Sequence, residues 1–293
     1  MTRALVVIPH FFDPNGGGRH GSRCPDPLPR VRALAACLDG LHTSLGASQV
    51  AYDIASRVAP PANQREAVEL DVAIVTTGEK HLLAELPVPP DLYRHVATHE
   101  DGWMLGFACR DVLRAGLGAY DWFLFIEDDL VLHDPLFLRK VAWFRGLAGE
   151  QRILQPNRFE SDVRALAHKA YVDGDLPKRV LDPWRTTFDP DTLPALEGRV
   201  LGAPVRFVPA ANPHGGCFFL SASQMERLAV QPWFALRDTS FVGPLESAVT
   251  LPLIRTFEVY KPAPENASFL ELRHFGTGFL SLLRPRPEVR PAE

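Results

Sequence analysis

The stretch that decides the fold is residues 120–135, YDWFLFIEDDLVLHDP, in which an aromatic and aliphatic run meets three consecutive acids. The run at residues 122–126 is short, apolar and rich in Phe, Ile and Trp, which is typical of a buried strand. Glu127, Asp128 and Asp129 follow it directly. Three adjacent carboxylates repel one another and are costly to desolvate unless a positive charge lies nearby. A hard divalent cation such as Mg²⁺ or Mn²⁺ would satisfy them, because oxygen ligands suit both ions. The simpler alternative is an acidic turn between a strand and a loop.

Length, composition and charge exclude several classes of protein. The 293 residues suffice for one large α/β domain or two small ones. A hydrophobic content of 46% with 23% charged residues is typical of a soluble globular protein. The net charge of −4 excludes a nucleic-acid binder that relies on phosphate contacts. The four cysteines are far apart and form no CxxC pair, which argues against a zinc cluster or a disulfide scaffold. No apolar stretch reaches membrane-spanning length, so we expect a cytoplasmic protein.

Strand-like and helix-like segments alternate along the first half of the chain. Apolar residues recur at helical intervals in residues 28–45 and 102–117. Strands are predicted at residues 4–8, 71–76, 93–98 and 122–126. This alternation predicts an α/β fold with a mostly parallel central sheet flanked by helices. Ligands of such sheets bind at the carboxyl ends of the strands, which is where the three acids fall.

The second half of the chain has a weaker pattern. A helix is predicted at residues 135–147, further helices begin at Ser221 and Gly243, and strands are predicted at residues 152–154, 205–208, 218–220 and 257–260. Residues 173–203 are rich in Pro, Asp and Arg and lack a steady period, so we expect a loop with short helical pieces. Another strand is predicted at residues 50–54. The last ten residues, RPRPEVRPAE, predict a poorly ordered tail.

Four short motifs occur in a suggestive order along the chain. They are Glu127-Asp128-Asp129 after a strand, His214-Gly215-Gly216 after a strand, Leu245-Glu246-Ser247 at a helix start, and the late His274. Together they resemble the landmarks of the GT-A class of nucleotide-sugar glycosyltransferases over residues 4–275. The acids resemble its DxD metal motif in an EDD form, and the glycines resemble its acceptor-side loop. The third motif is similar to the xED element, although Ser247 stands at the usual acid position and Glu246 one position earlier.

The resemblance implies a GT-A-like, Rossmann-type sandwich in a single catalytic domain of residues 1–281. Its nucleotide-binding half would cover about residues 1–135 and its acceptor-binding half about residues 136–281, before a flexible tail at 282–293. Such an enzyme uses Mn²⁺ or Mg²⁺ and a UDP- or GDP-linked sugar donor. Its acceptor would be a glycan or a lipid-linked molecule, and a lipid-linked acceptor would bring the protein to the inner face of the membrane. No nucleic-acid partner is implied.

The resemblance also implies roles for individual residues. The metal ligands would be Asp129, Glu127 and His274, and the donor would be contacted by Pro9, Glu127, Asp128 and Arg110. Glu246 would be the base that deprotonates the acceptor hydroxyl. The acceptor would be contacted by His214, Gly215, Gly216 and Trp184. Arg158 is a further candidate for the acceptor site, and residues 173–203 would form a lid or an acceptor-binding insertion. Structural alternatives exist for each role: a helix-start glutamate commonly complements the helix dipole, and a lone histidine is commonly packed.

Two other functions remain open from the sequence. A nucleotidyltransferase that makes nucleotide sugars shares the sheet and the metal-binding acid, but it usually carries a glycine-rich basic loop directly after the first strand. Here Gly16-Gly17-Gly18-Arg19 comes eight residues after Ile8, which disfavours this alternative. A non-catalytic carbohydrate-binding protein is the third function, and it would not need three acids at the end of a buried strand.

Overall fold

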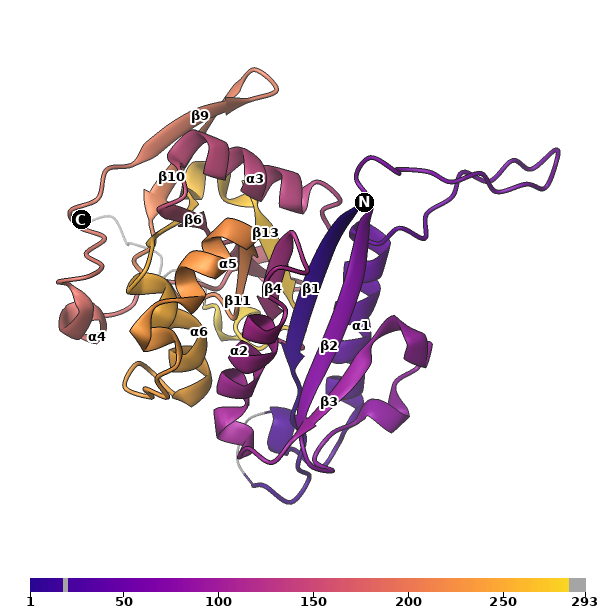
Figure 1. The fold of residues 1–293 in the computed structure, drawn as a ribbon, viewed down its shortest axis with the longest axis horizontal. Helices are drawn as coiled ribbons and strands as arrows, with labels where there is room; N and C mark the ends of the chain where they lie inside the picture. Colours follow the sequence, from indigo (N-terminus) through magenta and orange to yellow (C-terminus); the bar gives the residue numbers. More distant parts are fainter. Residues whose placement is uncertain (18–20, 285–293) are drawn as a thin grey trace, which may run out of the picture.

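A five-stranded sheet forms the centre of the protein (Figure 1). The structure is a computed structural model, and it describes residues 1–17 and 21–284. The strands of the central sheet, in spatial order, are β11 (Cys217–Ser221), β4 (Trp122–Ile126), β1 (Thr2–Pro9), β2 (Val68–Thr77) and β3 (Arg94–Thr98). β1 pairs in parallel with both β2 and β4, and β2 pairs in parallel with β3, whereas β11 is antiparallel to β4. The predicted α/β class is confirmed, and the sheet itself is mixed.

Helices cover both faces of this sheet, which explains the continuous apolar runs of its strands. The helices are α1 (Leu28–Ser44), α2 (Leu105–Ala115), α3 (Phe137–Ala148), α5 (Ala222–Ala229) and α6 (Pro244–Ile254). Successive residues of a strand point to opposite faces. In β1, Val6 and Ile8 therefore join the core formed with α1 and α3, while Leu5 and Val7 join the core formed with α2, α5 and α6.

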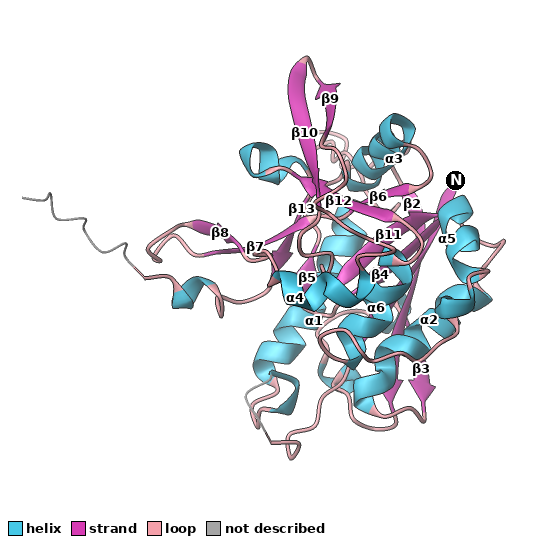
Figure 2. Ribbon diagram, turned by 90° about the vertical axis from the view of Figure 1, so that its left-hand side faces the viewer, coloured by secondary structure: helices cyan, strands magenta, loops and turns pink. Residues whose placement is uncertain are grey.

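Two smaller mixed sheets complete the fold (Figure 2). One contains β6 (Arg152–Leu154), β12 (Glu258–Pro262), β10 (Ala203–Pro209) and β9 (Leu196–Val200), and the other contains β5 (Leu130–Val131), β13 (Glu271–His274), β7 (Asn157–Ser161) and β8 (Lys169–Tyr171). The sequence did not predict β7, β8 and β9, which are short and half-exposed or exposed along much of their length. β13 pairs with β5 so that His274 faces Leu130, immediately after the three acids.

Two sequence predictions about loops have different outcomes. Within residues 173–203 the expected short helical pieces are present as α4 (Lys178–Leu181) and the 3₁₀ turn η5 (Asp182–Trp184), before β9 begins. The prediction of a strand at residues 50–54 is wrong. This segment forms only isolated bridges in an arm that projects from the body (Figure 1), and Ile54 is 80% exposed because no sheet neighbour covers it.

Some predictions fall outside the described residues. These are Gly18 and Arg19 of the glycine-rich segment and residues 285–293 of the expected tail. Within residues 1–17 and 21–284, none of the helices combines the length and the apolar character that crossing a bilayer requires.

Candidate functional site

The sheet topology brings three of the four sequence motifs to one edge of the central sheet. The parallel strands β1 and β4 end at this edge, and the antiparallel strand β11 begins there, with Cys217 opposite Ile126. The backbone N–H of Glu127 donates a 2.9 Å hydrogen bond to the carbonyl of Gly216, which joins the acidic motif to the glycine loop. The backbone N–H of Phe275 donates a 2.7 Å hydrogen bond to the carbonyl of Asp129, which fixes the end of β13 beside the acids.

A cleft of about 380 Å³ opens at this edge and also receives the fourth motif at the start of α6. The predicted residues that line it are Pro9, Glu127, Asp128, Asp129, Arg158, His214, Glu246 and His274. Arg23, Arg30, Trp103 and Phe279 line it as well. The structure therefore gathers residues from the whole length of the chain around the three acids.

Arg30, in the first turn of α1, supplies the positive charge that the acidic triplet needs. Its Nη1 donates to Asp129 Oδ2 at 2.9 Å, and its Nη2 pairs with Asp128 Oδ1. Burial opposes ionisation of Asp129, but Arg30, His274 and Arg158 together outweigh it and hold the pKa of Asp129 below its ordinary value. The Arg30 guanidinium thus supplies, beside Asp128 and Asp129, part of the positive charge that the sequence analysis assigned to a metal alone.

His10 fixes the second acid in place. The backbone N–H of Leu82 donates to His10 Nε2 at 3.1 Å, so the ring proton lies on Nδ1, which donates to Asp128 Oδ2 at 2.6 Å. Asp128 is 1% exposed, and both of its oxygens have protein partners. Asp128 therefore ties β1 and α1 to the end of β4. It also lines the cleft, and its contact with the donor stays a prediction.

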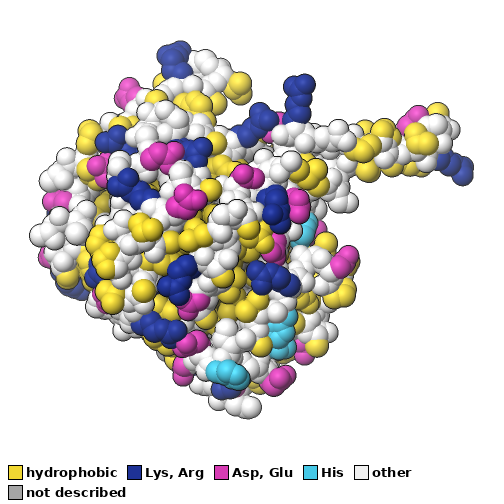
Figure 3. All heavy atoms as spheres, in the orientation of Figure 1, with side chains coloured by type: hydrophobic (Ala, Val, Ile, Leu, Met, Phe, Trp, Pro, Cys, Tyr) yellow, Lys and Arg dark blue, Asp and Glu magenta, His cyan; other side chains and the backbone are white. Residues whose placement is uncertain are grey.

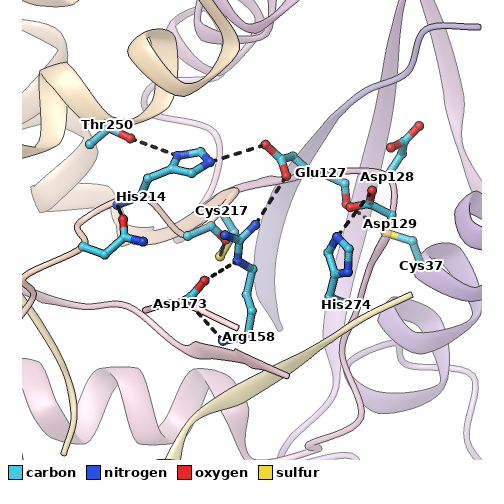
Figure 4. Close-up of polar contacts among 12 residues, drawn as sticks. Cys37, Glu127, Asp128, Asp129, Arg158, Asp173, His214, Cys217, Thr250 and His274 are labelled. Atoms are coloured by element: carbon cyan, nitrogen blue, oxygen red, sulfur yellow. Dashed lines mark hydrogen bonds and ion pairs between the residues drawn. The ribbon is translucent and has the colours of Figure 1, made fainter. Parts of the chain in front are cut away.

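His274 is held so that one ring nitrogen faces Asp129. Its Nδ1 donates to Glu160 Oε1 at 2.9 Å, and its Nε2 lies 3.9 Å from Asp129 Oδ2 (Figure 4). Glu160 is fully buried, and its second oxygen accepts a 2.7 Å hydrogen bond from the backbone N–H of Leu280. A carboxylate behind a histidine is the arrangement that orients metal-binding imidazoles in proteins, because it fixes the tautomer.

Glu127 points away from this pair, towards the acceptor-side loop (Figure 4). Its carboxylate lies 3.9 Å from Arg158 Nη1 and 4.0 Å from His214 Nε2. Burial and the charge of Asp129 raise the pKa of Glu127 to about 8, against the opposing charge of Arg158. Burial, together with Arg158, lowers the pKa of His214 to about 3, so its imidazole is neutral. The prediction that Glu127 ligates the metal together with Asp129 and His274 is corrected, because its carboxylate is turned to the other side.

Arg158 is anchored by a buried charge cluster. Its Nε donates to Asp173 Oδ1 at 2.7 Å, and Lys261 Nζ donates to Asp173 Oδ2 at 2.8 Å. The Asp173 side chain is 2% exposed. Burial opposes its ionisation, yet the charges of Lys261 and Arg158 keep the pKa of Asp173 below its ordinary value. The cluster aims the free end of the Arg158 guanidinium at the cleft.

Gly216 is required for this packing. It has φ of +63°, a region that favours glycine, and a Cβ built there would collide with the Glu127 carboxylate. The neighbouring Gly215 lies against the Gln155 side chain, and the His214 ring is held by a 3.1 Å contact between Nδ1 and Thr250 Oγ1. The loop therefore positions His214 and gives Glu127 its space.

Arg110 and Trp184 are not brought to the cleft. Arg110 lies on α2 between the rings of Phe107 and Phe234 and is 4% exposed. Trp184 is buried against Phe241 and lines a separate hollow. Their predicted contacts with donor and acceptor are corrected, because each side chain is committed to aromatic packing elsewhere.

Two atoms of the cleft fit a divalent cation. Asp129 Oδ1 is buried and has no hydrogen-bond partner, and His274 Nε2 lies 3.9 Å from the other oxygen of the same carboxylate, Oδ2. No cluster of three His, Cys, Asp or Glu side chains with metal-ligand spacing occurs within the part of the chain that is described. A two-residue set still fits Mg²⁺ or Mn²⁺, since such ions commonly take one or two protein ligands and complete their shell with phosphate oxygens and water.

Sequence patterns missed Arg30, His10, Glu160, Asp173 and Lys261. Most of their contacts join distant parts of the chain; Arg30 and Asp128, for example, are 98 positions apart. The one available signal was electrostatic: three adjacent acids require a cation, and Arg30 stands in the first turn of a predicted helix.

None of the protein-family models matches the chain, and no protein of curated function matches its sequence. Support for a function therefore comes from the geometry of the cleft.

Proposed function

We propose that this protein is a metal-dependent glycosyltransferase with a GT-A-like fold, which transfers a sugar from a nucleoside diphosphate donor to a hydroxyl acceptor. The observation that carries the proposal is the proximity of Asp129 and His274. The buried Oδ1 of Asp129 lacks a partner, and Glu160 orients the His274 ring so that its Nε2 lies 3.9 Å from Oδ2 of the same carboxylate. This pair shares its cleft with Glu246 and His214. The cleft thus combines a cation site with a carboxylate that can serve an acceptor.

Asp129 and His274 would hold the cation, which when bound stabilises the charge that develops on the leaving nucleoside diphosphate. Arg30 and Arg158 line the same cleft and add fixed positive charge for the phosphate oxygens. Pro9, at the end of β1, contributes to the wall on the donor side.

Glu246 would take the proton from the acceptor hydroxyl. It lies in the first turn of α6 and lines the cleft beside Leu245. His214, neutral in this environment, offers its Nε2 to a hydroxyl or to Glu127. We assign the acceptor to the part of the cleft between Glu246 and His214.

Turnover measurements test the proposal against its alternatives. Purified protein is incubated with UDP- and GDP-sugars and a panel of glycan and lipid-linked acceptors, with and without Mn²⁺. We expect release of nucleoside diphosphate that depends on Mn²⁺. Release of pyrophosphate from a nucleoside triphosphate and a sugar phosphate would instead identify a nucleotidyltransferase, and glycan binding without any metal effect would exclude catalysis by this cleft.

Glu160→Gln is expected to weaken Mn²⁺ binding by about 10- to 100-fold. The backbone N–H of Leu280 requires an oxygen at the position of Oε2, so the amide NH₂ of glutamine must face His274 Nδ1. Nδ1 then accepts a hydrogen bond, the ring proton moves to Nε2, and Nε2 loses its lone pair. Calorimetric titration with Mn²⁺ measures the loss. The exposed Glu150→Gln serves as the matched control, and an unchanged Mn²⁺ affinity in Glu160→Gln would show that His274 does not bind the metal.

Glu246→Gln is expected to lower the rate of transfer by about 10²- to 10⁴-fold while the Kd for the donor stays near that of the wild type. The amide cannot accept the acceptor proton, whereas the donor contacts lie elsewhere in the cleft. Rates are compared with donor binding under identical metal concentrations. Glu226→Gln, an exposed change on α5, is the control. Survival of full activity in Glu246→Gln would assign Glu246 to stabilisation of the α6 dipole alone.

A further inference from the structure

Arg110 is a buried cation without a carboxylate partner. It is 4% exposed, and among residues 1–17 and 21–284 it forms no ion pair. Its side chain donates one long hydrogen bond, 3.4 Å from Nη2 to the carbonyl of Trp233, and the rings of Phe107 and Phe234 flank its guanidinium. A guanidinium has five N–H donors, so most of the hydrogen-bonding capacity of Arg110 is unused. A buried charge left in this state favours an incoming anion.

Two further arginines converge on the same place. Arg110, Arg114 and Arg237 line a pocket of about 250 Å³ between α2 and the segment that follows the 3₁₀ turn η6 (Pro232–Phe234). The side chains of Arg114 and Arg237 are 48% and 43% exposed, so the pocket opens to solvent. In Figure 3, Lys or Arg side chains gather with acidic neighbours over the face that carries α2. The pocket and the cleft share no lining residue.

Nearby acids do not cancel this charge. Asp111 pairs with Arg114 at 2.8 Å and lies 3.9 Å from Arg237, and Glu100 pairs with Arg237 at 2.6 Å. Two carboxylates therefore face three arginines, and Arg110 is the one left without a partner. Burial, together with the charges of Arg114 and Arg237, lowers the pKa of Arg110 to about 10 despite the nearby Asp111.

We propose that this pocket is a second anion-binding site, which takes a phosphate group on Arg110, Arg114 and Arg237. A phosphate monoester has several oxygens in a tetrahedral arrangement and up to two negative charges, which suits a pocket lined by three guanidinium groups, two from α2 and one from the segment after η6. A carboxylate offers only two oxygens and one charge. The pocket volume admits a phosphate group but not a whole nucleotide sugar, so the ligand is a small phosphate or a phosphate head that protrudes from a larger molecule.

The site is independent of the proposed transfer reaction. Arg110 lies five residues along α2 from Leu105, which lines the cleft, and this corresponds to roughly 7.5 Å of helix rise. Phosphate bound at Arg110 would therefore leave the cleft open for its own substrates. The phosphate can come from two sources, a free phosphate compound or the head of an anionic lipid, and the experiment has an arm for each.

The first arm titrates the full chain with inorganic phosphate at low salt by calorimetry. We expect Arg110→Met to weaken binding at least about tenfold, because a buried charged hydrogen-bond donor is lost while Met fills the space between the rings. The double variant Arg114→Gln/Arg237→Gln changes only exposed side chains and is expected to weaken binding to a similar extent. It keeps the test decisive if Arg110→Met fails to fold. Arg164→Gln, an exposed change elsewhere, is the matched control.

Because the cleft also contains arginines, the titration is repeated with Arg158→Gln. Retention of phosphate binding there, together with its loss in the double variant, assigns the phosphate to the second site. The second arm measures sedimentation with vesicles of phosphatidylcholine that do or do not contain phosphatidic acid. Binding to the acidic vesicles that requires Arg114 and Arg237 would identify a lipid head as the ligand, and phosphate binding without vesicle binding would identify a free phosphate compound. If neither phosphate nor vesicle binding depends on these arginines, the proposal is overturned.

Discussion

Asp129→Ala is expected to abolish Mn²⁺ binding and to lower sugar transfer by at least about 10³-fold, because a metal that stabilises the leaving group contributes several kcal/mol to catalysis. The change removes Asp129 Oδ1, the buried oxygen that has no hydrogen-bond partner in the protein and that we propose as a metal ligand. The fold should persist, since Arg30 keeps its contact with Asp128. Calorimetry with Mn²⁺ and a transfer assay measure the two effects separately.

Two comparisons make the Asp129 result decisive. Asp91→Ala, at an exposed position on a 3₁₀ turn, controls for the loss of an acid and should leave both measurements unchanged. Normal turnover in Asp129→Ala would remove the metal from the proposed mechanism. Loss of turnover with intact Mn²⁺ binding would place the cation elsewhere and make Asp129 a contact of the substrate.

Arg30→Met is expected to lower the free energy of unfolding by about 3–5 kcal/mol, because removing one partner of a buried ion pair leaves the others uncompensated. Arg30 contacts both Asp128 and Asp129, whose side chains are only 2% and 18% exposed. Burial works against the charge of Arg30 itself, yet the two acids raise its pKa, which reflects the same mutual dependence. Urea unfolding, performed without divalent cations, measures the change in free energy.

A second substitution tests the cause of that loss. Arg30→Met/Asp128→Asn should recover part of the stability, since it removes one of the stranded charges while preserving the shape of the side chain. Arg32→Met, at an exposed position on the same helix, should have little effect. An unfolding free energy of Arg30→Met within about 1 kcal/mol of the wild type would mean that the acids do not depend on this cation.

Local sequence patterns were sufficient to predict β4 and the motifs that line the cleft. The apolar run at residues 122–126 is fully buried as β4, and the acids fall at its carboxyl end as the parallel arrangement requires. The prediction that Glu246, His214 and His274 belong with the acids rested on motif order, and all three line the same cleft. The proposed roles of these residues remain predictions.

The orientation of the side chains could not be predicted from local sequence patterns. Glu127 and Asp129 are two positions apart, yet one faces Arg158 and the other faces His274. Arg110 has a suitable charge, but it packs against the ring of Phe107 on its own helix and against that of Phe234 from a distant segment. Contacts across a hundred residues of chain depend on how whole elements pack, and no spacing rule within one element contains that information.

The antiparallel pairing of β11 with β4 affects how the protein can be divided. β11 comes from the second half of the chain and covers an edge of β4, whose five residues are all buried. A chain shortened before Cys217 would expose that edge, with unpaired backbone groups along an apolar strand, and such edges recruit other molecules into aggregates. We therefore expect an N-terminal fragment that ends before β11 to aggregate, and β4, which leads into the three acids, acquires its cover late in synthesis.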